Sequence, residues 1–124
     1  NNDDGISELL PADPDPAPKV KVIASEHVGC STYEIRGESH TMGNAMRWAL
    51  SKNKKVNFAG YTIPHTSENC LHLRVQTVEL DKVAAAEVME EAFGTLESIM
   101  DHMISQYKVA VQEYLSNEES EMAP

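Results

Sequence analysis

The side chains best suited to metal binding are five histidines and two cysteines, spread over 124 residues. Only Cys70 and His72 stand close together, with one residue between them. Structural zinc sites add a second ligand pair at a spacing such as C-x₂-C or H-x₃-H, which the sequence lacks. We therefore interpret Cys70 as a buried thiol at a strand edge and His72 as a surface histidine, and expect no metal or other cofactor.

Nucleophilic catalysis has no stronger support in the sequence. Ser39 and His40 are adjacent, but catalytic triads are assembled in space rather than along the chain. Neither a G-x-S-x-G elbow nor a G-K-[ST] phosphate loop occurs. We expect no catalytic residues and predict that the chain is not an enzyme by itself.

One basic cluster, formed by Arg47, Lys52, Lys54 and Lys55, lies close to Trp48. Cations beside an aromatic ring are typical of nucleic-acid contacts, but cations also favour the C-terminal end of any helix. A free-standing nucleic-acid-binding module is therefore an alternative function.

The formal charge of −10 is concentrated at the two ends of the chain. Residues 1–18 carry five acids and residues 117–124 carry three, with no lysine or arginine in either segment. The remaining body has twelve acids against ten bases, so it exerts little long-range attraction on nucleic acids or membranes. No segment is apolar over the roughly 18 residues that a membrane span needs. Two cysteines without a dense framework predict reduced thiols and an intracellular protein.

The apolar patterns predict four strands and two helices. Residues 19–30 and 31–37 are expected to form two strands joined near Val28 and Gly29, and residues 56–63 a third. In residues 71–78, alternate positions are apolar, which is typical of a half-buried strand. Apolar residues spaced as i, i+3, i+4 and i+7 predict a helix after position 41, with Thr41 as its N-cap and Ser39 as the alternative.

A second helix is predicted over residues 82–115, with Asp81 as its N-cap. Its apolar residues are spaced by three or four positions from Met89 to Tyr114. Such a helix is about 50 Å long, whereas a domain of about 100 residues is roughly 30–35 Å across. We therefore predict that another chain buries part of the stripe, with the contact residues Phe93, Leu96, Met100, Met103 and Tyr107.

Three motifs, ESHTMGNAMRW (38–48), VNFAGYTIPHTSE (56–68) and LHLRVQT (71–77), closely resemble one protein family. They are similar to the smaller alpha-like subunits shared by RNA polymerases I and III, which are related to the polymerase II subunit eleven counterpart, archaeal subunit L and the bacterial alpha-subunit assembly domain. The first family pattern, E-D-H-T-L-G-N-x-L-R, has Ser39, Met42 and Met46 in place of its acid and two leucines. The second, G-Y-x-I-P-H-P-S-E, has Thr66 in place of its second proline.

The resemblance implies an α+β fold in which a four-stranded antiparallel sheet carries two helices on one face, the C-terminal helix being long. The dimerisation domain would span residues 19–116, between an acidic, proline-rich extension (1–18) and an acidic tail (117–124). The implied function is non-catalytic: a heterodimer with the larger alpha-like subunit forms the platform for the two large catalytic subunits, beside a small zinc-binding assembly subunit. The implied location is the nucleus, including nucleolus and nucleoplasm. The alternative function is that of the equivalent polymerase II subunit.

Dimerisation through the helices would place residues of both helices at the interface. From the first helix these are Met42, Gly43, Asn44, Met46, Arg47 and Trp48. Gly43 and Asn44 are poor helix formers, so we expect a bulky group to approach Gly43 closely and Asn44 to hydrogen-bond a buried loop backbone. In the N-terminal extension, we expect Ile6, Leu9 and Leu10 to anchor on neighbouring subunits and Asp13 and Asp15 to face basic patches there.

Overall fold

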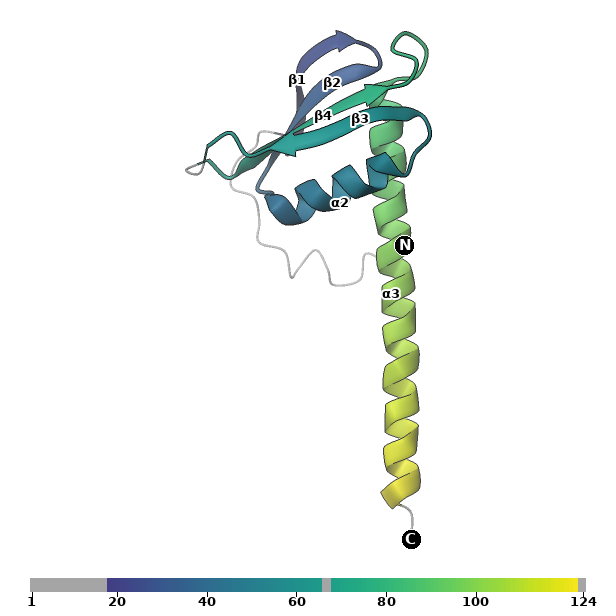
Figure 1. Ribbon diagram of the computed structural model, residues 1–124. Coiled ribbons are helices and arrows are strands. Elements are labelled where there is room, and N and C mark those ends of the chain that lie inside the picture. The colour runs from purple at the N-terminus through teal and green to yellow at the C-terminus, as the bar shows by residue number, and fades with distance from the viewer. Residues whose placement is uncertain (1–17, 66–67, 123–124) are drawn as a thin grey trace.

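The computed structural model describes residues 18–65 and 68–122. The elements are β1 (Val20–His27), β2 (Cys30–Arg36), α2 (His40–Ser51), β3 (Val56–Thr62), β4 (Cys70–Thr77) and α3 (Ala85–Met122). The strands form one antiparallel sheet in the order β1-β2-β4-β3. Helix α2 lies along the sheet, and α3 extends far beyond it (Figure 1). The predicted α+β architecture is confirmed.

The core forms between the helices and one face of the sheet. Leu71, Leu73 and Val75 of β4 are fully buried there, and they cluster with Met46 of α2 and Val88 of α3. Successive strand residues point to opposite faces, so the intervening residues of β4 lie on the outer face. The alternation predicted from the sequence of this strand is confirmed.

The start of α2 differs from the preferred prediction. Ser39 occupies the N-cap position without a side-chain capping hydrogen bond, and the helix begins at His40. Thr41 as N-cap is therefore wrong, and the alternative position is correct. The reason is a tertiary contact: Nδ1 of His40 lies 2.8 Å from the hydroxyl of Tyr61 on β3, which holds His40 against the sheet.

The start of α3 also lies later than predicted, at Ala85 rather than after Asp81. The backbone N–H of Ala85 donates to the carbonyl of Val28, and the Thr77 hydroxyl donates to the carbonyl of Val83 over 2.8 Å. The N–H of Gly29 also donates to the carbonyl of Leu80, so residues 78–84 are tied to the β1–β2 turn and to the end of β4 rather than continuing the helix. Asp81 as N-cap is wrong for this reason.

At its other end, α3 continues to Met122 instead of stopping at residue 115. Part of the acidic segment 117–124 is therefore helical, and the Tyr114 hydroxyl donates to Oε1 of Glu118 one turn later, over 3.0 Å. With 38 residues, α3 is about 57 Å long. No helix within the described residues is long and apolar enough to cross a membrane. The anchor residues expected in segment 1–17 lie outside the described residues.

A polar clamp holds the first turns of α3 against the loop that follows α2. Nζ of Lys55 donates to Oε1 of Glu91 over 2.6 Å and to Oε1 of Glu87 over 3.1 Å. The Asn53 amide donates to the other carboxylate oxygen of Glu91. The clamp therefore sets the direction in which α3 leaves the domain.

The clamp predicts a pH dependence of folding stability. Hydrogen bonds from Lys55, and then from Asn53, hold the pKa of the Glu91 carboxyl below its usual value of 4.5. A lowered folded-state pKa adds stability above the unfolded value, and this stability is lost as the pH falls through the folded value. We expect the urea midpoint of the full chain to decrease when the pH is lowered below 4.5. In Glu91→Gln the decrease of the midpoint over the same pH range should be smaller. Glu90→Gln is the control, because Glu90 has no ion pair within residues 18–65 and 68–122; an equal effect of both variants would contradict the prediction.

Candidate protein–protein interface

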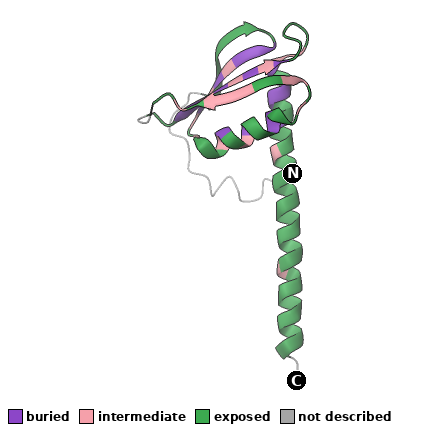
Figure 2. Ribbon diagram, in the orientation of Figure 1, coloured by how far each residue is buried: buried purple, intermediate pink, exposed green. Residues whose placement is uncertain are grey.

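The largest uncovered apolar surface runs along α3. Figure 2 shows that this helix is buried only in its first turns and is exposed over most of its length. Phe93 is 37% exposed, Met100 54%, Met103 56% and Tyr107 70%. These are four of the five α3 residues predicted to contact another chain, and the described part of this chain leaves them largely uncovered.

Seven apolar residues of α3 form one narrow stripe, in which Leu96 and Val111 are half-buried and the others are exposed. At about 100° per residue, positions 93, 96, 100, 103, 107, 111 and 114 fall within about 80° of the helix circumference. Their spacing is three or four residues throughout, close to that of the seam of a coiled coil. The stripe continues the side on which Met89 is buried, and Leu96 still packs against the chain's own core. The core side of α3 therefore extends beyond the domain that fills it.

A second uncovered apolar area lies at β1, on the same face of the sheet as the helices. Val20 pairs with the buried Ile35, and Val22 with the buried Tyr33. Residues opposite one another in adjacent strands share a face, yet Val20 is 39% and Val22 55% exposed. The sequence pattern indicated a strand here, and the position of β1 at the sheet edge shows that neither α2 nor α3 covers this area.

On α2, the exposed side carries a mixed aromatic and basic surface. Trp48 is 47% exposed, and Nζ of Lys52 lies 5.8 Å from its ring centroid. The guanidinium of Arg47 donates to Oδ1 of Asn44 over 3.0 Å and lies 5.8 Å from the Tyr61 ring. Asn44 is therefore exposed and held by Arg47. The expected hydrogen bond from Asn44 to buried loop backbone is wrong for the residues described.

Gly43 is explained by a contact within the chain. A Cβ atom at this position would lie 2.6 Å from two ring carbons of Tyr61, closer than such atoms approach in proteins. The hydroxyl of the same tyrosine lies 2.8 Å from Nδ1 of His40. The expected close approach of a bulky group at Gly43 is confirmed, and that group comes from β3.

The structure thus divides the eleven predicted contact residues. Met46 is fully buried in the chain's own core, Gly43 is buried beneath Tyr61, and Met42 and Leu96 are partly buried against the core. These four support the helices from within. The remaining seven are exposed and stay predicted contacts: Asn44, Arg47, Trp48, Phe93, Met100, Met103 and Tyr107.

The other residues singled out in the sequence lie in three different parts of the domain. Nδ1 of His40 lies 2.8 Å from the Tyr61 hydroxyl, so this ring nitrogen contacts β3. Lys55 of the basic cluster is paired with Glu87 and Glu91, which reduces the positive charge available to a nucleic acid. Cys70 is buried and His72 half-buried on the outer sheet face, away from the helices.

Comparison with known proteins finds one matching family. Residues 30–106 match the model described as the RNA polymerase Rpb3/Rpb11 dimerisation domain. This range begins at β2 and includes the core, α2 and about half of α3.

Two curated relatives are subunits of RNA polymerases I and III. The chain is 34% identical to subunit RPAC2 of Danio rerio over 92 residues, which are 74% of this chain and 80% of that protein. It is 36% identical to subunit rpc19 of Dictyostelium discoideum over 95 residues, with 77% and 79% covered. The polymerase II subunit rpb11 of Dictyostelium discoideum is 29% identical over 108 residues, with 82% and 90% covered.

Among solved structures, the chain resembles DNA-directed RNA polymerase subunit L of Thermoplasma acidophilum. The TM-score is 0.66, and the match covers 78% of this chain and 92% of that one. At 20% identity, this likeness supports the fold alone.

The Gly43–Tyr61 contact gives a prediction for the α2 helix. Replacing glycine by alanine inside a helix ordinarily adds up to about 1 kcal/mol of stability. At Gly43 the added methyl group meets the Tyr61 ring, so we expect Gly43→Ala to lower the free energy of unfolding by about 1–3 kcal/mol. Gly94→Ala in α3 is the matched control, because a Cβ there meets nothing within 4 Å and stability should rise. Equal stabilisation by both changes, measured by urea unfolding, would show that the Tyr61 contact is unimportant.

Proposed function

Because this chain belongs to the RNA polymerase Rpb3/Rpb11 dimerisation domain family, we propose that it is the smaller alpha-like subunit shared by DNA-directed RNA polymerases I and III. It is a non-catalytic assembly subunit of a nuclear polymerase and heterodimerises with an alpha-like partner. Its contribution to transcription is therefore structural, because it holds other subunits of the polymerase in place.

The observation that carries this proposal is the uncovered stripe of α3. A soluble helix with so many half-exposed apolar side chains on one side is stable against aggregation only when a second surface covers them. Leucine and methionine side chains spaced by three or four residues, such as Leu96, Met100 and Met103, suit packing against another helix. We place the larger alpha-like subunit on the stripe and on the adjoining exposed side of α2 around Trp48.

The heterodimer would form the platform on which the two large catalytic subunits assemble, together with a small zinc-binding subunit. In this role the chain serves the synthesis of ribosomal RNA, 5S RNA and transfer RNA, in the nucleolus and the nucleoplasm. The names of the relatives support a place in polymerases I and III, and the family description supports dimerisation.

The equivalent subunit of polymerase II is the second candidate. It is supported by the match to a polymerase II subunit, but at 29% identity against 34–36% for the polymerase I and III subunits. The G-Y-x-I-P-H-x-S-E motif of residues 60–68 also favours the polymerase I and III assignment. A free-standing nucleic-acid-binding module is less well supported, because the clamp occupies Lys55 and the body of the chain is slightly acidic.

The assignment is tested by purifying the tagged full chain from cells and identifying the chains that accompany it. We expect the larger alpha-like subunit and the large subunits of polymerases I and III. Recovery of polymerase II large subunits instead would transfer the assignment to the second candidate.

The stripe itself is tested by truncating two methionines. Met100 and Met103 are more than half exposed, so Met100→Ala with Met103→Ala should leave the urea midpoint of the chain alone nearly unchanged. Burial against the partner should make the same pair of changes weaken the heterodimer at least about tenfold, which corresponds to about 1.4 kcal/mol. Leu96 is left intact because it also supports the core.

Val109→Ala is the control for this experiment. Val109 is 50% exposed on α3 but lies on the opposite side from the stripe, at about 160° from Phe93. Its truncation should leave heterodimer affinity unchanged. An equal loss in the control, or full affinity in the double variant, would place the partner elsewhere.

A further inference from the structure

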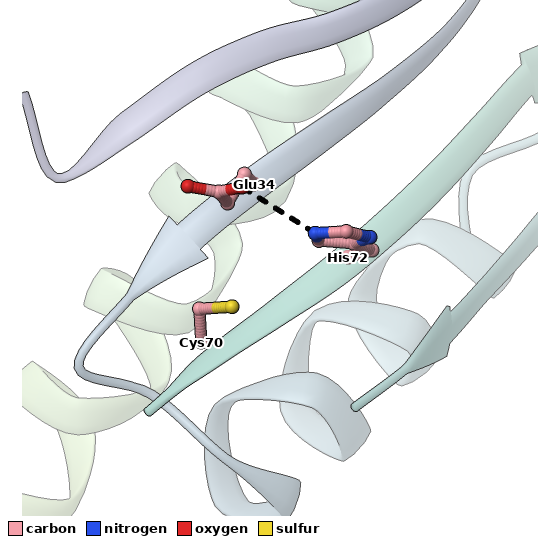
Figure 3. A group of neighbouring side chains, drawn as sticks. All are labelled: Glu34, Cys70 and His72. Carbon is pink, nitrogen blue, oxygen red and sulfur yellow. Dashed lines mark ion pairs between the residues drawn. The ribbon is translucent and has the colours of Figure 1, made fainter. Parts of the chain in front are cut away.

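The outer face of the sheet brings together three side chains that ligate metals. Glu34 of β2 and His72 of β4 are directly opposite one another in the strand pairing, and Cys70 lies two residues before His72. Alternate residues of a strand share a face, so all three side chains emerge on the side away from the helices. Figure 3 shows them gathered across the two strands. Their ligand atoms lie within 4.8 Å of one another.

The spacing of two ligands already matches a tetrahedral centre. Nε2 of His72 and Oε2 of Glu34 are 3.4 Å apart. With metal–ligand bonds of about 2.0–2.1 Å, the edge of a zinc tetrahedron between nitrogen and oxygen ligands is about 3.3–3.4 Å. The edge between a sulfur ligand and a nitrogen or oxygen ligand is about 3.6 Å. The Cys70 sulfur lies within 4.8 Å of the other two ligand atoms, so it has to move inward by up to about 1 Å.

We propose that Glu34, Cys70 and His72 form a site for a zinc-class divalent cation, bound through one sulfur, one nitrogen and one oxygen. Zinc is favoured because a thiolate and an imidazole are ligands of borderline-soft metals, whereas magnesium and calcium prefer oxygen ligands alone. The bound ion would join the end of β2 to the beginning of β4, on the face that the helices leave free.

The surroundings leave one coordination position for a further ligand. The side chains of Glu34 and His72 are 21% and 29% exposed, so solvent reaches the site and a water molecule completes the tetrahedron. Nζ of Lys21 lies 3.7 Å from Oε1 of Glu34, whereas the other carboxylate oxygen, Oε2, faces His72. The site thus has three protein ligands and one open position.

Binding includes one proton transfer. A cysteine ordinarily carries its proton at neutral pH, whereas the ligand of a metal is the thiolate. The cation forms a bond to the sulfur, the S–H bond breaks, and the proton passes to the solvent, with no change of oxidation state.

The second cysteine offers a natural control. Cys30 is also buried and lies on the same two-stranded face, where it is opposite Gln76 at the far end of the β2–β4 pair. Its sulfur accepts from Arg74 over 3.2 Å and donates to Glu26 over 3.3 Å. Cys30 therefore tests for unspecific thiol binding without touching the proposed site.

The experiment titrates Co²⁺ into the reduced, chelator-treated full chain and records the optical spectrum. We expect one equivalent to produce thiolate-to-cobalt charge transfer and intense four-coordinate ligand-field bands, both displaced by Zn²⁺. Cys70→Ser should remove the charge-transfer band, and His72→Gln and Glu34→Gln should each weaken binding at least about tenfold, while Cys30→Ser should behave like the unchanged chain. Absence of a charge-transfer band in the unchanged chain, or its loss on Cys30→Ser, would overturn the proposal.

A second measurement uses only the unchanged chain, so its result does not depend on whether a variant folds. X-ray absorption at the zinc edge of the loaded chain should show one sulfur and otherwise nitrogen or oxygen neighbours, with the sulfur at about 2.3 Å. A first shell without sulfur, or with two sulfurs, contradicts a site built on Cys70 alone.

Discussion

A helix longer than the domain that carries it is the constraint on which this structure depends. Only the first turns of α3 reach the core, through small and medium side chains such as Ala85, Val88 and Ala92. Beyond them the same side of the helix stays apolar, and residues 18–65 and 68–122 leave it largely uncovered. Such a surface suits burial against another chain, because a helix of about 57 Å extends far beyond the sheet that carries it.

The rest of the fold holds that helix in a defined direction. The hydrogen bonds from residues 77 and 85 tie its start to the β1–β2 turn and to its own loop, and the Lys55 clamp ties its second turn to the loop after α2. Individual exposed ion pairs contribute little to stability. Here several act at one point of a rigid element, so a small angular restraint at the base determines the position of side chains far along the helix.

The two faces of the sheet carry different chemistry because strand side chains alternate. The inner face contributes a continuous apolar core under α2 and α3, and the uncovered valines of β1 extend it toward the edge. Neither α2 nor α3 lies over the outer face, which carries polar groups that include Arg74 and the Glu34–His72 pair. A partner seated on the helices would therefore leave the outer face of the sheet free for a separate interaction.

The sequence by itself determined the type and order of the elements and the need for a partner. Alternation over residues 71–77 and the three- and four-residue spacing from 89 onward are local properties, and each reports which side of an element is apolar. The motif at 38–48 and its companions also sufficed to predict the family and the fold. The excess length of the last helix could be found by comparing its span with the size of the domain.

Only the tertiary structure decided how residues far apart in the chain meet. The Tyr61 ring fills the space at Gly43 and sets His40 as the first residue of α2, and the hydrogen bond to Val28 delays α3 until Ala85. In the same way, strand register brings Glu34 beside a Cys-x-His pair that is incomplete in the sequence. Periodicity reports the environment of one element at a time, whereas these contacts depend on how the strands and helices pack against one another.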